Sequence, residues 1–373
     1  MNLLIRIIKW TLISILSVVV VLLVLNILPV TISKVKDENH FRKTSDYPMI
    51  IPHGGAKELA PENTIWAYDM LINEFDADVL EIDLALTKDN ILIAHHDLDL
   101  EMSSDSDMNG AYIRNYTYDE ILAEYKADDY YLARQFEYPS DYDYDPIKGI
   151  KPFENETDEA ILSKLVPAKL EDIFKDVGAD VLYILEIKDS PTSQGYDESV
   201  HNFELAAQTL IDLVETYELE TRVVLASFSD DVTSYFKTNA PDILVNAGTS
   251  EVTMFAVFSA FYIDFFWGVK SEVLILPTPS SMSITGGTAN LLDMLPSFIR
   301  NNIAIKDDSG VYRANLMGKE IINDAHRKNM AVLYWTVNDE DDMRLLIKNG
   351  ADGIITDRPD LLIKIIEELK NED

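Results

Sequence analysis

Short apolar segments alternate with helix-like ones from residue 47 to the C-terminus of this 373-residue chain. Eight segments read as strands, at residues 49–53, 79–86, 91–96, 181–188, 222–228, 243–247, 332–337 and 353–356. Helical spacing fits residues 64–75, 203–217, 231–238, 318–328 and 340–348. This alternation predicts an α/β fold, a (β/α)8 TIM barrel. A doubly wound open sheet is the competing architecture, but no glycine-rich dinucleotide turn follows the first strand.

The charge and cysteine content exclude several classes of function. The formal net charge is -34, which argues against nucleic acid as a partner because phosphate backbones are bound by Lys/Arg patches. The chain has no cysteine, so disulfides, thiolate nucleophiles and cysteine-ligated zinc are excluded.

The N-terminal region predicts a membrane anchor. Residues 10–30 carry no charge and are numerous enough to cross a hydrocarbon core of roughly 30 Å as a transmembrane helix, preceded by a flank at 1–9. No convincing cleavage site follows, so we expect an uncleaved span rather than a signal peptide. A polar linker is expected at 31–46 and the barrel at 47–373. The predicted location is the cell membrane, single-pass, with the barrel outside the cytoplasm.

Three carboxylates lie in apolar strands. Glu81 and Asp83 are two positions apart, so both side chains point to the same face of one strand. Glu186 repeats the pattern in another strand, with Lys188 on the same face. Like charges in apolar surroundings cost free energy unless a cation or proton lies between them. The three carboxylates therefore predict a hard divalent cation with oxygen ligands, Ca2+ or Mg2+.

Two histidines end strands beside these carboxylates. His53 and His96 would flank the cation at the mouth of the barrel, and we expect acid/base roles for both. His95 falls on the opposite face of its strand by alternation. The other histidines lie in linker or helix contexts and are expected at the surface: His40, His201 and His326.

Two segments interrupt the alternation. Residues 98–166 are acidic and tyrosine-rich, and we expect them to form an insertion at the mouth of the barrel. Residues 254–267 crowd seven aromatic side chains together. Two interpretations stay open for them: core packing, or an apolar flap facing a membrane or lipid chain.

The motifs, taken in order, resemble those of the glycerophosphodiester phosphodiesterase family. The resemblance covers about residues 49–364 and is specific because nine short motifs occur in the same order. They are His53-Gly54-Gly55, Pro61-Glu62-Asn63-Thr64, Glu81-Ile82-Asp83, Thr87-Lys88-Asp89, His96-Asp97, Leu185-Glu186-Ile187-Lys188, Ser227-Phe228, Trp335-Thr336-Val337-Asn338 and the stretch from Asp352 to Pro359.

The resemblance implies a (β/α)8 barrel with an insertion after the third strand, and it implies roles for eight residues. The metal ligands would be Glu81, Asp83 and Glu186, the acid/base pair His53 and His96, and the substrate-binding residues Lys188, Trp335 and Glu62. Pro-Glu-Asn-Thr also reads as the start of a helix, which is a competing explanation for Glu62.

One position departs from the family pattern. The family usually has arginine directly after the first histidine, where this chain has Gly54. That arginine is expected to bind phosphate oxygens through its planar fork of donors. Lys188, Lys57 or the metal are the alternatives for this role in the present chain.

The expected function is therefore metal-dependent hydrolysis of a glycerophosphodiester to glycerol 3-phosphate and an alcohol, with a small or lipid-derived phosphodiester as substrate. Two alternatives stay open. One is lysophospholipase D-like action on membrane lysolipids at the same site. The other is a catalytically silent, membrane-tethered binding protein, against which the retained histidines and carboxylates argue.

Overall fold

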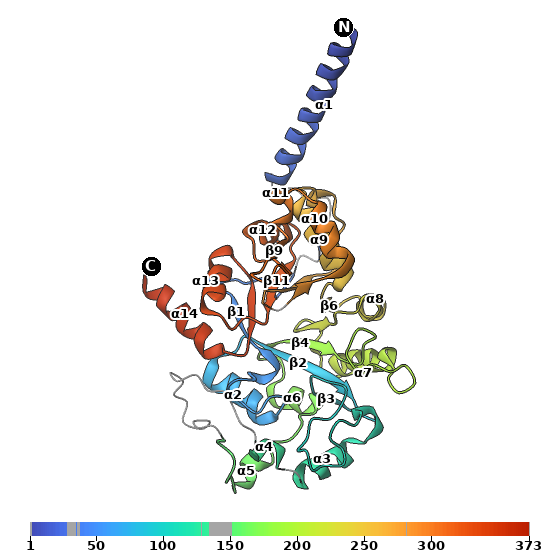
Figure 1. The fold of residues 1–373 in the computed structure, drawn as a ribbon. Coiled ribbons are helices and arrows are strands. Elements are labelled where there is room, and N and C mark those ends of the chain that lie inside the picture. Colours follow the sequence, from blue (N-terminus) through green and yellow to red (C-terminus); the bar gives the residue numbers. More distant parts are fainter. Residues whose placement is uncertain are drawn as a thin grey trace.

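Eight parallel strands close into a barrel in the computed structural model, which describes residues 2–27, 35, 38–127, 129–133, 151–280 and 282–372 (Figure 1). These strands are β1 (Met49–Pro52), β2 (Val79–Leu86), β4 (Leu182–Ile187), β5 (Val223–Ala226), β6 (Leu244–Val245), β7 (Val273–Pro277), β11 (Ala331–Trp335) and β12 (Gly353–Thr356). Two ladders run in the orders β2-β4-β5-β6 and β7-β11-β12-β1. A parallel bridge from Asn246 to Val273 joins them on one side, and the Asp78 amide donates to the Ile50 carbonyl on the other. The predicted barrel is confirmed.

A helix follows each barrel strand before the next one begins. These helices are α2 (Ile65–Phe75), α6 (Leu170–Val177), α7 (Phe203–Thr216), α8 (Asp230–Asn239), α9 (Thr249–Ala260), α12 (Lys319–Arg327), α13 (Glu340–Asn349) and α14 (Pro359–Glu372). The Pro61–Thr64 motif does start a helix, because the Thr64 hydroxyl accepts from the Ala67 amide at the beginning of α2.

The sequence predicted the correct number of barrel strands, but one predicted strand lies outside the barrel and one barrel strand was not predicted. Residues 91–96 contain β3 (Leu92–Ala94), which pairs antiparallel with β2 and lies outside the barrel. Only residues 87–91 separate the two strands, which is a hairpin connection, whereas a parallel crossover needs a dozen residues or more. The missing barrel strand is β7, a short apolar run that the sequence reading passed over.

Two insertions extend the barrel. The first falls within the expected 98–166 and contains α3 (Tyr118–Ala127), α4 (Tyr130–Ala133) and α5 (Glu159–Leu162); residues 128 and 134–150 lie outside the described part of the chain. This insertion follows β3 and therefore lies in the chain between β2 and β4, which are neighbouring strands of the barrel. The second was not expected: between β7 and α12, strands β8 (Ser283–Ile284), β10 (Tyr312–Ala314) and β9 (Ala304–Lys306) form an antiparallel sheet beside α10 (Gly286–Met294) and α11 (Ser297–Arg300).

The N-terminal residues form a helix, α1 (Asn2–Ile27), that projects from the globular body (Figure 1). Among the residues described, no helix combines the length and apolar character that crossing a membrane requires. This finding does not support the transmembrane helix expected at 10–30, whose last three residues are not described. The location at the cell membrane stays a prediction.

Part of the expected linker at 31–46 belongs to the barrel. Phe41 is fully buried and joins the apolar cluster inside the barrel, together with Ile51, Val79 and Ile184. The Asn39 side-chain amide donates to two backbone carbonyls at the amino ends of barrel strands. Glu272 directly precedes β7, and Asn329 lies two residues before β11. Phe41 therefore closes the end of the barrel opposite the carboxyl ends of the strands.

The aromatic segment at 254–267 divides between the two interpretations. Phe255 is fully buried, and Trp267 packs edge-on against Phe258 with ring centroids 5.3 Å apart. Phe261 and Phe266 are exposed. Core packing therefore explains some of these rings, and the others lie at the surface.

Candidate active site

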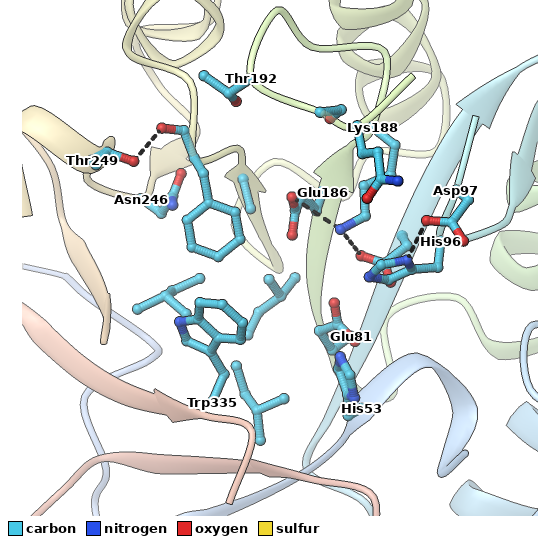
Figure 2. Close-up of a pocket in the computed structure, with 18 of the residues that line it drawn as sticks. His53, Glu81, His96, Asp97, Glu186, Lys188, Thr192, Asn246, Thr249 and Trp335 are labelled. Atoms are coloured by element: carbon cyan, nitrogen blue, oxygen red, sulfur yellow. Dashed lines mark hydrogen bonds and ion pairs between the residues drawn. The ribbon is translucent and has the colours of Figure 1, made fainter. Parts of the chain in front are cut away.

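A cavity of about 440 Å³ opens at the carboxyl ends of the barrel strands (Figure 2). It brings together seven of the eight residues that the sequence singled out: His53, Glu81, Asp83, His96, Glu186, Lys188 and Trp335. They come from β2, β4 and β11 and from the residues that follow β1, β3 and β4, and they are up to 282 positions apart in the chain. Glu62, the eighth, lines a neighbouring cavity instead.

The strand register places the carboxylates. Asp83 on β2 is the direct ladder neighbour of Glu186 on β4, and Glu81 lies two positions earlier on the same face. Glu81 and Asp83 are buried. Burial and the neighbouring Asp83 carboxylate raise the pKa of Glu81 above its usual range. A group of carboxylates this deep in the barrel needs a compensating cation or a proton.

Lys188 supplies one compensating charge. Its Nζ lies 2.9 Å from Oδ1 of Asp83 and 3.1 Å from Oε1 of Glu186, so the ammonium stands between the two carboxylates. Burial alone would lower the pKa of Lys188, but the two carboxylates outweigh it and raise the pKa well above the usual value. For Asp83, burial is likewise outweighed, chiefly by Lys188, and the pKa falls below the usual range. Lys188 is therefore a permanent cation in this cavity.

His53 is held by a carboxylate that the sequence analysis did not assign. Its Nδ1 lies 2.7 Å from Oδ1 of Asp357, and the Asn338 side-chain amide donates to Oδ2 of Asp357 at 2.7 Å. Burial opposes the charged imidazole, but the Asp357 hydrogen bond and the Glu81 charge outweigh it, so the pKa of His53 is raised. With Nδ1 engaged, Nε2 is the ring nitrogen left for chemistry.

His96 lies across the cavity from Trp335 and is more exposed than His53 (Figure 2). Its Nδ1 lies 2.9 Å from Oδ1 of Asp97. His95 is buried, and its Nδ1 is 2.9 Å from the Asp97 carbonyl oxygen. The predicted choice of His96 over His95 agrees with this placement, since only His96 lines the cavity that holds the carboxylates.

Three of these residues form a group that could hold a metal ion. One ligand atom from each of His53, Glu81 and Asp83 can be chosen so that all lie within 4.8 Å of one another. Oδ2 of Asp83 is buried and has no hydrogen-bond partner in the structure, which leaves a carboxylate oxygen for a cation to satisfy. The oxygen-rich donor set suits Mg2+ or Ca2+. Glu186, the third predicted ligand, is not in this group because Lys188 lies between it and Asp83.

Gly54 has a structural role of its own. Its φ is +53°, and its amide donates to Oε2 of Glu81 at 2.7 Å, so the turn after β1 is tied to the carboxylate cluster. A Cβ at this position would lie 2.9 Å from Cε and 3.9 Å from Nζ of Lys57. The Lys57 side chain therefore already fills the space that a side chain at residue 54 would enter.

An apolar wall faces the charged half of the cavity. The rings of Trp335 and Phe228 pack with centroids 4.9 Å apart, and Ile275 of β7 adds to the same lining. Polar groups that the sequence analysis missed complete the rim: Thr192 after β4, Asn246 after β6 and Thr249 at the start of α9 (Figure 2). This division suits a small ligand with a charged centre and a carbon skeleton.

A second cavity of about 310 Å³ adjoins the first, and His96 and Asp97 line both. Glu62 lines this second cavity, with Oε2 3.7 Å from Nζ of Lys57. Tyrosines of the first insertion form part of its wall. The structure thus places Glu62 beside the carboxylate cluster rather than within it.

The sequence did not assign some of these positions, and two histidines that it placed at the surface are not exposed. Asp357 and Asn338 belong to motifs that directly follow β12 and β11, so their position at strand ends could have marked them as site residues. Their pairing with His53 could not be read from the sequence. His201 was expected at the surface, but it is buried and stacks on Tyr196 with ring centroids 5.5 Å apart. His326 was also expected at the surface, but it is half-buried, with Nε2 2.8 Å from Oδ2 of the buried Asp352, whereas His40 is exposed as expected.

The sequence and fold match known proteins across this whole region. Residues 53–361 match the model of the glycerophosphoryl diester phosphodiesterase family. A glycerophosphodiester phosphodiesterase from Caldanaerobacter subterraneus subsp. tengcongensis is 24% identical over 322 residues, which cover 86% of this chain and 98% of that protein.

Solved structures show the same fold. The glycerophosphoryl diester phosphodiesterase domain of a Mycobacterium tuberculosis protein aligns with a TM-score of 0.58 and 14% identity, covering 86% of this chain and 99% of that one. A phosphodiesterase from Oleispira antarctica, solved in complex with the product sn-glycerol-3-phosphate, aligns with a TM-score of 0.51 and 15% identity over 86% of this chain and 97% of its own.

Proposed function

The chain belongs to the glycerophosphoryl diester phosphodiesterase family, and on this premise we propose that it is a metal-dependent phosphodiesterase that hydrolyses glycerophosphodiesters to glycerol 3-phosphate and an alcohol. The observation that carries the proposal is the cavity in which two histidines, four carboxylates and a lysine meet. A phosphoric diester hydrolase needs a proton acceptor, a proton donor and positive charge beside the phosphate, and these residues supply each of them. The Oleispira antarctica relative was solved with sn-glycerol-3-phosphate bound, which supports this choice of product.

The carboxylates of Glu81 and Asp83 would hold the cation, and a ring nitrogen of His53 lies within 4.8 Å of them. Glu186 would join them only if the Lys188 ammonium left its place between Glu186 and Asp83. When bound, the cation supplies positive charge that neutralises the developing charge on the phosphate oxygens. Ca2+ and Mg2+ both fit the carboxylate ligands.

The two histidines divide the proton transfers. His53, oriented by Asp357, accepts the proton of the attacking glycerol 2-hydroxyl through Nε2. The phosphorus–oxygen bond to the alcohol then breaks, and His96 donates a proton to the leaving oxygen. Water opens the resulting cyclic phosphate with the two histidines in reversed roles, so one diester and one water give glycerol 3-phosphate and one alcohol.

Lysines supply the charge that the family's usual arginine would bring. Lys188 lies in the cavity between Asp83 and Glu186, within reach of a phosphate at the carboxylate cluster. Lys57 fills the space beside Gly54, where that arginine would begin. An ammonium group binds phosphate as a point charge and does not need the fork geometry of a guanidinium. Gly54 is therefore compatible with activity.

The test measures release of glycerol 3-phosphate from glycerophosphocholine and from lysophosphatidylcholine by the full chain, with Ca2+, with Mg2+ and with excess EDTA. We expect turnover of the deacylated diester that EDTA abolishes and added metal restores. His53→Ala and His96→Ala should each lower kcat by roughly 10²–10⁴-fold. His40→Ala, at an exposed position outside both cavities, is the matched control.

Full turnover in excess EDTA would contradict the metal requirement. Release from the lysolipid alone would move the function to membrane lipids. A folded, metal-binding chain that is silent on both substrates would favour a binding protein.

A further inference from the structure

Exposed apolar side chains gather in one part of the globular body. Among the residues described, nine large apolar side chains outside α1 are exposed, and eight of them fall between residues 254 and 305. These eight, called the apolar patch below, are Met254, Phe261, Tyr262, Phe266, Met282, Leu291, Met294 and Ile305. The ninth is Leu345 on α13. Such a concentration marks an interaction surface, whereas single exposed apolar residues are ordinary.

The two halves of the apolar patch are neighbours. One half belongs to α9 and to the 3-10 turn η4 (Asp264–Phe266) that follows it, and the other belongs to the second insertion. A cavity of about 200 Å³ is lined by residues of both α9 and the second insertion. Figure 1 shows α9, α10 and α11 together at the end of the globular body from which α1 projects.

The patch is displayed by packed structure. In η4, Oδ2 of the buried Asp264 lies 2.9 Å from Nη2 of Arg327 on α12. In the second insertion, the hydroxyl of the buried Tyr312 donates to Oδ1 of Asp293 on α10 at 2.7 Å. The elements that carry the patch are therefore tied to the body and to each other, and their apolar side chains still face outward.

The patch region has no net charge, although the chain is strongly acidic. From Met254 to the end of β9 there are three acidic and three basic residues: Asp264, Glu272, Asp293, Lys270, Arg300 and Lys306. The rest of the chain therefore carries the whole formal net charge of -34. Membrane surfaces with anionic lipids repel an acidic protein surface, so this region is the one that can approach them closely.

α1 indicates which kind of partner covers this end of the molecule. It approaches η4, so the helix and the patch lie together. Val18–Val21 are four consecutive residues, and all four are exposed. Successive helical residues are about 100° apart, so these side chains point to every side of α1. A groove on a protein covers one face of a helix, whereas lipid chains surround it.

We propose that the apolar patch is a membrane-docking surface, which holds this end of the barrel against a lipid bilayer. Phe266, Leu291 and Met294 enter the boundary between headgroups and acyl chains, where docked apolar faces reach a depth of roughly 5–10 Å. Tyr262 suits the same boundary because its ring is apolar and its hydroxyl is polar. The inference concerns where the chain works and goes beyond the proposed hydrolysis.

The first experiment places a fluorescent label at one position at a time. The chain has no cysteine, so one introduced cysteine carries the only label. Phe266→Cys and Met294→Cys report from the patch, and Leu345→Cys is the matched control at an exposed apolar position on α13. Each labelled full chain is mixed with vesicles of equal parts phosphatidylcholine and phosphatidylglycerol that carry a nitroxide quencher just below the headgroups. The labels at residues 266 and 294 should lose at least about half of their fluorescence, and the label at residue 345 should lose little.

The second experiment measures binding to the same vesicles, without the quencher, by flotation. A chain with Phe266→Ser, Leu291→Ser and Met294→Ser together should have a vesicle partition coefficient at least about tenfold lower, because three large apolar side chains no longer leave water. Leu345→Ser should leave the partition coefficient unchanged. Thermal melting confirms that each variant is folded.

Two results would overturn the membrane-docking surface. If α1 alone binds the vesicles, all three labels stay unquenched and the triple variant floats like the unaltered chain. If a second copy of the chain covers the patch, the fluorescence at residues 266 and 294 changes with protein concentration before vesicles are added, and the quencher has no effect. Hydrolysis of glycerophosphocholine in solution is measured without vesicles, so failure of docking and failure of the proposed function remain distinguishable.

Discussion

Asp357 is the residue on which the orientation of His53 depends. Its carboxylate lies 2.7 Å from Nδ1 of His53 and contributes to the raised pKa of that imidazole. Asp357→Asn keeps the size of the side chain but removes the charge. We expect kcat to fall by roughly 10²–10⁴-fold, because the imidazole loses its fixed tautomer and the partner that stabilises its protonated form. Initial rates on a glycerophosphodiester at saturating metal measure this.

The pH profile distinguishes positioning from a general loss of structure. Asp357 raises the pKa of His53, so its replacement lowers that pKa, and the acid limb of kcat/KM should move to lower pH. Asp360→Asn is the control, since Asp360 pairs with Arg358 and lines neither cavity. An unchanged acid limb in Asp357→Asn would show that Asp357 does not act through His53.

At this scale the sequence predicted which residues line the cavity better than it predicted how they pair with one another. Carboxylates in apolar strands and histidines at strand ends are visible in a linear pattern because strand alternation fixes which way they point. The pairing of His53 with Asp357 joins β1 to the end of β12, so it exists only once the barrel has closed. The insertion of Lys188 between two predicted metal ligands is likewise a matter of side-chain conformation, which alternation does not determine.

The N-terminal segment before β1 is an element of the barrel, and Phe41 is the part of it that matters for stability. Phe41 is fully buried in the cluster inside the barrel. Phe41→Ala should lower the free energy of unfolding by about 3–5 kcal/mol, because it removes a buried ring and leaves a cavity. Urea unfolding followed by circular dichroism measures this. Phe266→Ala, at a ring that is exposed, should change the free energy of unfolding little, and an equal loss in both variants would contradict the role of Phe41.

The strands show which element boundaries a sequence defines. β2 and β4 were predicted nearly to the residue, since long apolar runs bounded by polar turns have few alternatives. β7 was missed because a five-residue apolar run has no periodicity to separate a strand from a buried helix segment. β3 was assigned to the barrel although its short connection allows only antiparallel pairing. The length of the connection between β2 and β3 would have excluded β3 from the barrel.

The charge of the whole molecule opposes one class of substrate and not another. With a formal net charge of -34, the chain repels an anionic diester such as glycerophosphoglycerol, whereas zwitterionic glycerophosphocholine has no net charge. Raising NaCl from about 10 mM to 150 mM shortens the screening length from roughly 30 Å to 8 Å. We expect kcat/KM for glycerophosphoglycerol to rise by roughly two- to tenfold, and that for glycerophosphocholine to change much less.

The two substrates serve as each other's control, since salt effects on folding, metal binding or the histidines would act on both. The long-range repulsion spans many ångströms of solvent and is screened, whereas Lys188 and the carboxylates beside it lie within the cavity and are screened little. Salt should therefore remove the repulsion before it weakens the local attraction. If salt instead lowers kcat/KM for glycerophosphoglycerol, the positive charge of the site already governs the approach of the substrate, and the acidic surface has no part in selecting it.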